Sequence, residues 1–271
     1  MRKLMVVLSF IFAFAVSAAD KIPALCPTKA DFANTRGHIQ GGCTSEDAFF
    51  FSYIKGVFKF DRNGKVLKHV PAVSHTGDIC YYKGKLYTAI AYYDKARKGK
   101  GAIQEYDTDL NELRRYELDF PIDGITCLNG TLYFGVGPNP QKLHRGNRVA
   151  KMPVDFSGKP EIFNIDHGYM THFGPQAVAN DGKNIFISFY CSEEDACQTG
   201  VFTPDLKLVK ALKFNASIGF DVVPWLSKKD DLVFFRLREV GPWGKKDRII
   251  DFFRYRNGQM VNVSRYAENE K

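Results

Sequence analysis

The sequence predicts an all-β fold, a five-bladed β-propeller of four-stranded antiparallel blades. Short runs of alternating apolar and polar residues end at Gly, Asn or Asp, and no stretch shows helical periodicity. Aspartates recur at matching turns, at intervals of 46, 48 and 50 residues between Asp61, Asp107, Asp155 and Asp205. A β-sandwich also has short alternating strands, but it does not require such a period. The regular spacing therefore favours the propeller.

The clearest blade lies at residues 77–120. Gly77–Tyr82 predicts a first strand, Lys83-Gly84 a tight turn and Lys85–Ala91 a second strand. Residues 102–109 and 112–120 alternate in the same way and predict the third and fourth strands. The same four-strand pattern recurs at residues 37–70, 122–165, 174–214 and 219–266. We therefore expect five blades in one domain spanning residues 20–271.

Residues 1–19 have the features of a secretory signal peptide. A basic start at Arg2 and Lys3 precedes an apolar run, and Ser17-Ala18-Ala19 supplies the small residues of a cleavage site. The apolar run is about thirteen residues, whereas a membrane-spanning helix needs about twenty. We expect an exported protein, periplasmic or secreted, that neither inserts stably into a membrane nor binds nucleic acid. An uncleaved anchor is the alternative.

The six cysteines all follow the predicted signal peptide, and an oxidising compartment permits disulfides. We expect a bridge between Cys191 and Cys197, which flank a short acidic loop. Cys26 with Cys43 is a second candidate pair. Cys80 and Cys127 lie at similar points of predicted inner strands, where a small buried thiol is expected. No Cys or His pair has zinc-finger spacing, so we expect no metal and no cofactor.

The formal net charge is +8, which falls to about +6 without Arg2 and Lys3. In an exported protein this balance indicates anionic ligands such as acidic glycans. On composition alone, a solvated basic surface that maintains solubility is the favoured explanation of the charge.

In a propeller, the innermost strands line the central channel, and the loops around its mouth usually carry the function. The starts of the predicted inner strands place polar residues at one mouth: His38, Gln40, His75, Asp78, Asp123, His172, Gln176 and Asp221. The loops between second and third strands add further candidates for ligand binding: Tyr92, Lys98, Arg145 and Arg236. Basic side chains pair with carboxylates or sulfates and aromatic faces cover sugar rings, so this surface predicts an anionic glycan or another small polar ligand.

Two chemistries fit these residues. A β-eliminating lyase would use a base such as His75 or His172, with His38 and Tyr92 as further candidates. A glycosidase would use two carboxylates, for which Asp78 and Asp123 are the obvious pair. We expect Asp78 to be the most functionally sensitive residue, so that Asp78→Asn lowers ligand binding or turnover but keeps the fold. If Asp78 instead accepts backbone N–H groups, its role is structural.

The segments HIQGG, HTGDICYYKGKLY and IDGITCLNGTLYFG resemble strand-turn-strand units of the plant-type glutamine cyclotransferases. The resemblance implies a five-bladed propeller that cyclises N-terminal glutamine with an acidic residue at the channel mouth. It would assign that acid to Asp78 and place Gln40 before the first inner-strand glycine. The family also holds its substrate with tryptophans, whereas the two tryptophans of this chain, Trp225 and Trp243, both fall in the last blade. An acidic-glycan enzyme or binding protein, a glutaminyl cyclase and a noncatalytic scaffold are therefore the three candidate functions.

Overall fold

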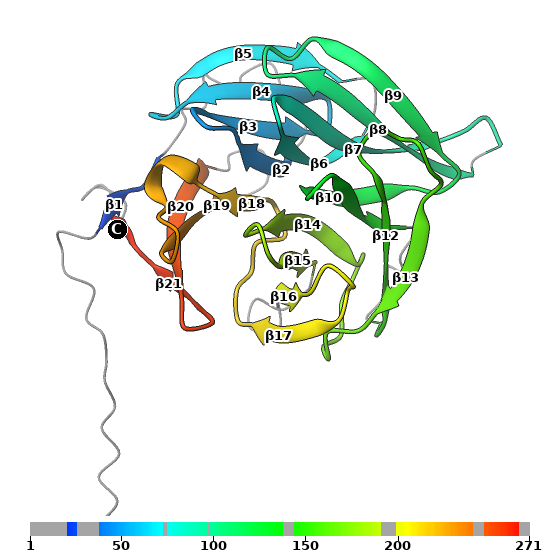
Figure 1. Cartoon of the computed structure of the whole chain (residues 1–271). Helices are drawn as coiled ribbons and strands as arrows, with labels where there is room; N and C mark the ends of the chain where they lie inside the picture. The colour runs from blue at the N-terminus through cyan, green and yellow to red at the C-terminus, as the bar shows by residue number, and fades with distance from the viewer. Residues whose placement is uncertain are drawn as a thin grey trace, which may run out of the picture.

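The computed structural model describes residues 21–25, 38–72, 75–96, 98–137, 144–190, 199–240 and 247–265. Five four-stranded antiparallel sheets surround a central axis (Figure 1), which confirms the predicted five-bladed propeller. The predicted signal peptide at 1–19 lies outside the described residues. Within the described ranges, no helix has the length and apolar character needed to cross a membrane.

Each blade consists of four consecutive strands. Blade one contains β2 (Ile39–Thr44), β3 (Ala48–Tyr53), β4 (Gly56–Asp61) and β5 (Val66–Pro71). Blade two contains β6 (His75–Tyr82), β7 (Lys85–Tyr93), β8 (Gly99–Asp107) and β9 (Glu112–Leu118). Blade three contains β10 (Ile122–Leu128), β11 (Thr131–Val136), β12 (Asn147–Pro153) and β13 (Glu161–Ile165).

The last two blades follow the same order. Blade four contains β14 (Pro175–Asn180), β15 (Ile185–Phe189), β16 (Thr199–Phe202) and β17 (Leu208–Leu212). Blade five contains β18 (Phe220–Val222), β19 (Leu232–Val240), β20 (Asp247–Arg256) and β21 (Gln259–Asn262), with a short 3-10 helix, η4 (Pro224–Leu226), after β18. Outside the blades, β1 (Ile22–Pro23) pairs in parallel with β22 (Ser264–Arg265).

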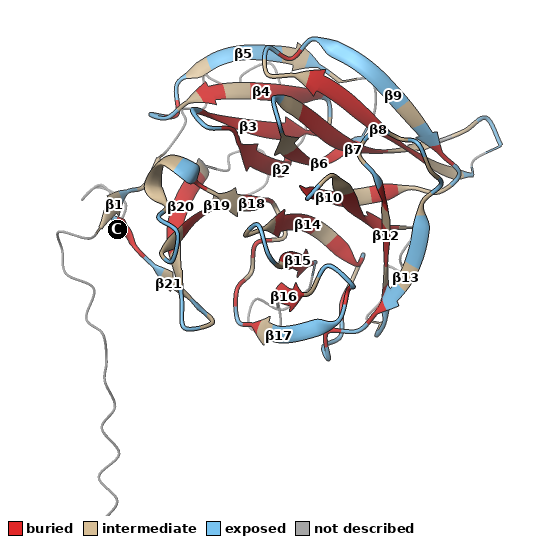
Figure 2. Cartoon of the chain, in the orientation of Figure 1, coloured by how far each residue is buried: buried red, intermediate tan, exposed pale blue. Residues whose placement is uncertain are grey.

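Burial falls from the axis to the rim of each blade. The inner strand β2 and its neighbour β3 are buried along their whole length, whereas the outer strand β9 exposes most of its residues (Figure 2). Inner strands are covered on both faces by the adjacent blades, so small and apolar residues occupy them. Outer strands meet water along one edge and accept the charged residues of the alternating pattern.

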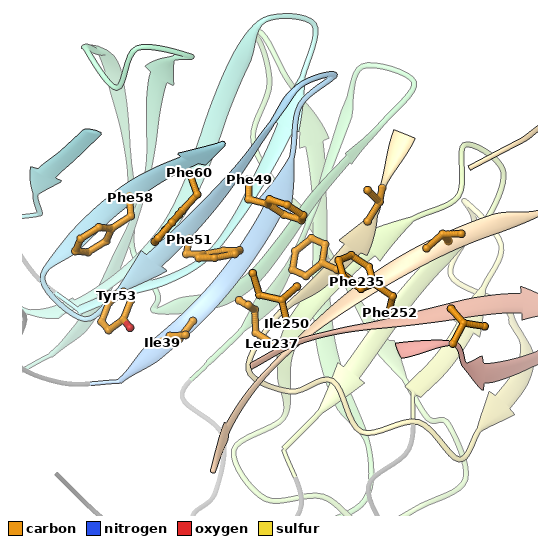
Figure 3. Packing of buried hydrophobic residues seen from close by; sticks show 13 residues of the cluster. Ile39, Phe49, Phe51, Tyr53, Phe58, Phe60, Phe235, Leu237, Ile250 and Phe252 are labelled. Atoms are coloured by element: carbon orange, nitrogen blue, oxygen red, sulfur yellow. The ribbon is translucent and has the colours of Figure 1, made fainter. Parts of the chain in front are cut away.

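The contact between blade one and blade five closes the ring. Phe49, Phe51 and Phe235 lie at its centre (Figure 3), and the Phe49 ring meets that of Phe235 edge-on at 5.5 Å between centroids. Edge-to-face pairs of this kind are favourable beyond the area that they bury. Side-chain packing across this seam and the small β1–β22 pair therefore join the two ends of the propeller.

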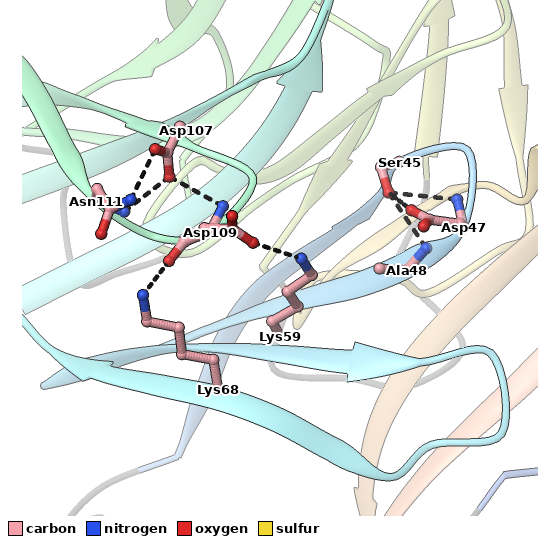
Figure 4. A network of polar contacts seen from close by, with 8 residues as sticks. All are labelled: Ser45, Asp47, Ala48, Lys59, Lys68, Asp107, Asp109 and Asn111. Atoms are coloured by element: carbon pink, nitrogen blue, oxygen red, sulfur yellow. Dashed lines mark hydrogen bonds and ion pairs between the residues drawn. The ribbon is translucent and has the colours of Figure 1, made fainter.

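The recurrent aspartates shape the turns between third and fourth strands, as the sequence predicts. One carboxylate oxygen of Asp107 accepts the backbone N–H groups of Asp109 and Asn111, each at 2.9 Å (Figure 4). Asp61 accepts those of Asn63 and Lys65 in the same manner. Such bonds stabilise a turn locally. The regular spacing of aspartates in the sequence therefore reflects the same turn recurring in successive blades.

The cysteine predictions have mixed outcomes. Cys43, Cys80 and Cys127 are free and buried. The expected bridge between Cys26 and Cys43 is therefore wrong, because the Cys43 side chain points into the core of blades one and two, beside Ile79. The expected bridge between Cys191 and Cys197 lies outside the described residues.

Asp78 occupies the axis of the propeller and is 1% exposed. Its Oδ1 accepts the N–H groups of Gly42 at 3.3 Å and Ile79 at 2.9 Å. Its Oδ2 accepts those of Ile125 at 3.3 Å and Val178 at 2.8 Å. One carboxylate therefore binds the inner strands of four blades, β2, β6, β10 and β14.

The surroundings of Asp78 assign it to the scaffold. Burial raises the pKa of Asp78, and hydrogen bonds from the Val178, Ile79 and Ile125 N–H groups oppose that rise. Both oxygens already accept two donors each, which uses the four acceptor positions of a carboxylate. This geometry favours the structural role over the catalytic role that the sequence suggested, and it leaves Asp78 no free oxygen for a ligand.

We predict that Asp78→Asn destabilises the protein by about 2 to 4 kcal/mol. An amide has one acceptor oxygen, so its NH2 group would face two buried backbone donors, each costing about 1 to 3 kcal/mol when left unpaired. Urea unfolding should be compared with Asp119→Asn, whose side chain is 95% exposed and which should change stability little. Equal stability of Asp78→Asn and the wild type would contradict the assignment.

Candidate functional site

The N-terminal mouth of the channel is the end at which the inner strands begin. We define it by His38, Gln40, His75, Asp123 and Gln176. The pairing of β2, β6, β10 and β14 with the second strand of each blade slips at this level, between Ile39 and Gly41 in blade one and at equivalent places in the next three. Such irregularities re-aim side chains and are frequent beside active sites. Gln40, Asp123 and Gln176 lie at these irregularities and have no paired residue on the neighbouring strand.

Asp123 has one engaged and one unengaged carboxyl oxygen. Its Oδ2 accepts the Gln176 Nε2 amide at 2.9 Å, while its buried Oδ1 has no hydrogen-bond partner among the described residues. Gly77 faces this oxygen, because a Cβ at Gly77 would lie 2.6 Å from Oδ1. Burial raises the pKa of Asp123 to about 7, and the bond from Gln176 opposes the rise. Asp123 is therefore a carboxyl group that can hold or release a proton near neutral pH.

Gln40 joins two imidazoles at the same mouth. Its Nε2 lies 3.2 Å from His38 Nε2 and 3.5 Å from His75 Nε2, and His38 Nδ1 lies 3.1 Å from the Ile39 carbonyl oxygen. This geometry lets His38 donate from Nδ1 and accept from Gln40 at Nε2. Desolvation lowers the pKa of His75, although the residue keeps an exposed edge. A neutral His75 is an available proton acceptor.

Aromatic side chains form a rim beside Gln176, which the sequence did not single out. Tyr169, Phe173 and Tyr190 are 44%, 40% and 42% exposed. The rings of Phe173 and Tyr190 meet edge-on at 5.3 Å, and Phe173 has a φ of +53°, which is uncommon for a residue with a side chain. His172, another predicted residue, is half-buried here, and its N–H donates to the Tyr190 carbonyl oxygen at 2.8 Å. The rim is thus held in place by backbone bonds.

Three of the four residues predicted on the second-to-third-strand loops, Tyr92, Arg145 and Arg236, contact acidic side chains. The Tyr92 hydroxyl donates to Glu117 on the outer strand β9. Arg145 pairs with Asp166 at 2.9 Å. Arg236 pairs with the buried Asp251 at 2.8 Å and packs over Phe214 and Phe253.

Lys98 is exposed, and its backbone N–H closes a turn on Asp94 at 2.9 Å. The further basic residues at 142, 245 and 246 lie outside the described residues. The guanidinium groups of Arg145 and Arg236 are held by ion pairs with Asp166 and Asp251.

Asp221 lies at the opposite end of the channel from its predicted position. Its Oδ2 accepts the Thr44 N–H at 3.2 Å, and Thr44 is the last residue of β2. The inner strand β18 has three residues, so Asp221 aligns with the ends of the other inner strands rather than with their starts. Asp221 therefore does not belong to the N-terminal mouth.

His167 was also missed by sequence reasoning. It is 1% exposed, it stacks on Phe189 at 3.9 Å, and neither ring nitrogen has a hydrogen-bond partner within the described ranges. Burial lowers its pKa to about 4, with Asp166 acting in the opposite direction. It lies beneath the aromatic rim, since its ring also contacts that of Tyr169 at 5.7 Å. No sequence signal distinguishes this histidine from a solvent-exposed loop residue.

The fold and its polar mouth define a five-bladed β-propeller with an acid–base group at the channel opening. The chain is similar to a glutaminyl cyclase from Myxococcus xanthus, at a TM-score of 0.58 and 10% identity over 86% of this chain and 95% of that one. It is also similar to a GH43_1 enzyme from Xanthomonas citri complexed with xylose, at 0.57 and 10% over 94% and 97%. RS223 β-xylosidase gives 0.52 and 11% over 85% and 96%.

At these identities the similarity shows the fold, and it agrees with the propeller and with the resemblance to glutamine cyclotransferases. The sequence matches no protein-family model and no curated protein. Activity must therefore be argued from the site itself.

We predict that Asp123→Asn stabilises the protein by about 1 kcal/mol at pH 8. The unfolded carboxyl ionises near its ordinary pKa, whereas the folded one keeps its proton until about pH 7, so Asp123 makes stability fall as pH rises from about 4 to 7. The amide removes this loss. Urea unfolding between pH 4 and 8 measures the difference, and a variant less stable than wild type at pH 8 would refute it.

A second prediction concerns His167→Phe, which should flatten the acid limb of the stability profile. Below about pH 6.5 the unfolded chain takes up a proton that folded His167 refuses until about pH 4, so wild-type stability falls over this interval by up to about 3 kcal/mol. The phenyl ring can stack on Phe189 without titrating. His69→Phe, at an exposed histidine in blade one that also stacks on a phenylalanine, is the control. An unchanged acid limb in His167→Phe would count against the assignment.

Proposed function

We propose that the protein is an exported β-propeller that binds a carbohydrate at its N-terminal mouth, with Asp123 giving or taking a proton. The observation that carries the proposal is the Asp123 carboxyl group, whose Oδ1 is buried and unengaged while Gln176 holds Oδ2 at 2.9 Å. Natural proteins seldom leave a buried polar atom without a partner unless a ligand or chemistry uses it.

The neighbouring groups support a polyhydroxyl ligand. The rim formed by Tyr169, Phe173 and Tyr190 offers exposed aromatic faces on which a sugar ring can stack. Gln176 and Gln40 add amide groups that can orient hydroxyls. Phe173 is three residues before Gln176, so apolar and polar contacts adjoin one another.

Acid–base chemistry follows from the same arrangement. Asp123 can exist in either protonation state near pH 7, and the strand that carries neutral His75 reaches Asp123 Oδ1 at Gly77. One group can therefore act as acid while the other acts as base, as elimination or hydrolysis at a glycosidic bond requires. A glycosidase using Asp78 with Asp123 is not part of the proposal, because Asp78 has no free oxygen. Two similar structures, the GH43_1 enzyme solved with xylose and RS223 β-xylosidase, are consistent with sugar binding on this fold.

The partner class that we propose is an anionic glycan. Lys95 and Lys98 are exposed after β7, and their positive charges favour an anionic ligand. The excess of basic residues in the whole chain favours one as well. Binding to such rim charges should weaken with salt, since they are screened over about 10 Å at 0.1 M. Export follows from the signal-peptide pattern at 1–19.

A glycan array that holds acidic and neutral sugars tests the proposal. We expect binding that prefers acidic sugars, and a loss of at least about tenfold in affinity or turnover, or about 1.4 kcal/mol, for Asp123→Asn and for Tyr190→Ala. Matched controls are Asp109→Asn, in the exposed turn between β8 and β9, and Leu67→Ala, on the outer strand β5.

Three outcomes would count against this function. Salt-independent binding of neutral sugars would remove the anionic preference. Full binding and turnover in Asp123→Asn would remove the acid–base role. Turnover of a peptide with N-terminal glutamine, without any glycan bound, would instead favour the cyclase activity of the similar Myxococcus xanthus protein.

A further inference from the structure

A cavity lies at the C-terminal mouth, where the inner strands end. It has a volume of about 300 Å³, within the range of small-ligand sites. Residues at or just after the ends of inner strands from all five blades line it: Thr44, Cys80, Cys127, Asn180 and Asp221. The turn after β6 adds Tyr82 and Lys83 to its wall. We call it the C-terminal cavity.

This cavity is separate from the N-terminal mouth. Asp78 lies on the axis between them and draws the N–H groups of Gly42, Ile79, Ile125 and Val178 onto its two oxygens. With these inner strands joined to one buried carboxylate, the axis is filled by protein at that level. A ligand in the C-terminal cavity would therefore bind independently of one at Asp123.

Two residues of the lining, Asn180 and Thr44, present acceptor oxygens to the cavity. Asn180 Nδ2 donates its two hydrogens to Thr126 Oγ1 at 2.9 Å and to the Cys127 carbonyl oxygen at 3.1 Å. The Thr44 hydroxyl donates its proton to the Val222 carbonyl at 2.6 Å. The oxygens that these residues still present can accept hydrogen bonds but not donate them. A ligand rich in N–H donors fits such a lining.

The described lining has one carboxyl group, at Asp221, and one lysine, at Lys83. The Oδ2 of Asp221 accepts one backbone N–H, that of Thr44. Lys83 places its Nζ 5.2 Å from the centroid of the Tyr82 ring at the rim, so a tyrosine face beside the cavity already accommodates an ammonium group. We propose that the C-terminal cavity binds a small ligand bearing an ammonium group, which pairs with Asp221.

Binding should depend on pH. Burial raises the pKa of Asp221 to about 7, opposed by hydrogen bonds from the Thr44 and Val222 N–H groups. The titratable groups around it are Cys43 on β2, Asp78 and Cys80 on β6, Cys127 on β10 and Lys83 in the turn. An ammonium ligand prefers ionised Asp221, so affinity should rise as pH increases through 7 and binding should release a proton from the protein.

Calorimetric titration of the full mature chain with propylammonium, 1-propanol and propionate tests this site. We expect propylammonium to bind about tenfold more tightly at pH 8 than at pH 6, because the ionised fraction of a group with a pKa of 7 changes by that factor. Propanol and propionate should bind at least about tenfold more weakly than propylammonium at pH 8. Asp221→Asn should abolish the preference for the amine, while Asp123→Asn should leave amine binding unchanged.

A second variant guards against a folding defect in Asp221→Asn. Lys83→Glu changes an exposed rim residue, replaces a cation with an anion and should tighten propylammonium binding several-fold. Equal binding of the amine and the alcohol, affinity that does not change between pH 6 and 8, or weaker amine binding in Lys83→Glu would each overturn the proposal. None of these results bears on carbohydrate binding at the N-terminal mouth.

Discussion

The hydrogen bonds of one buried carboxylate organise the centre of this propeller. Asp78 accepts N–H groups from the inner strands of four blades at distances of 2.8 to 3.3 Å. The approach is so close that a Cβ at Gly41 would lie 2.2 Å from Asp78 Oδ1. A glycine at position 41 is therefore required by the carboxylate, and each bond compensates part of the cost of burying a charge.

The same interaction divides the channel into two chemically different ends. Asp123 and Asp221 are each half-buried carboxyl groups with a pKa raised to about 7, one at either end of the axis. At the N-terminal mouth the carboxyl meets amides, imidazoles and exposed aromatic rings. At the other end it meets threonine, cysteine and the Tyr82 face. A fold with a plugged axis can thus hold two sites that do not compete.

The sequence predicts much of the fold because the residues that repeat in it form turns through local hydrogen bonds. Asp61 and Asp107 bind backbone groups two to four residues away, so the spacing of such residues reports the blades directly. The site is less predictable. Three of the four donors to Asp78 are remote in sequence and reach it across different blades. Asp221 was misplaced because β18 is so short. Asp123 and Gln176 were found, since both stand at the start of long inner strands.

The number of acceptor positions on a carboxylate has a consequence for the symmetry of the ring. Two oxygens offer about four positions, and the bonds from β2, β6, β10 and β14 occupy them all. Five equal blades cannot share one such hub equally. One blade is free to depart from the common pattern, and blade five does so with its three-residue inner strand and its own carboxyl group at Asp221. In a ring of five blades whose central carboxylate binds only four, the fifth blade can differ from the others. In this protein that blade carries a carboxyl group of its own, which gives the channel a second site.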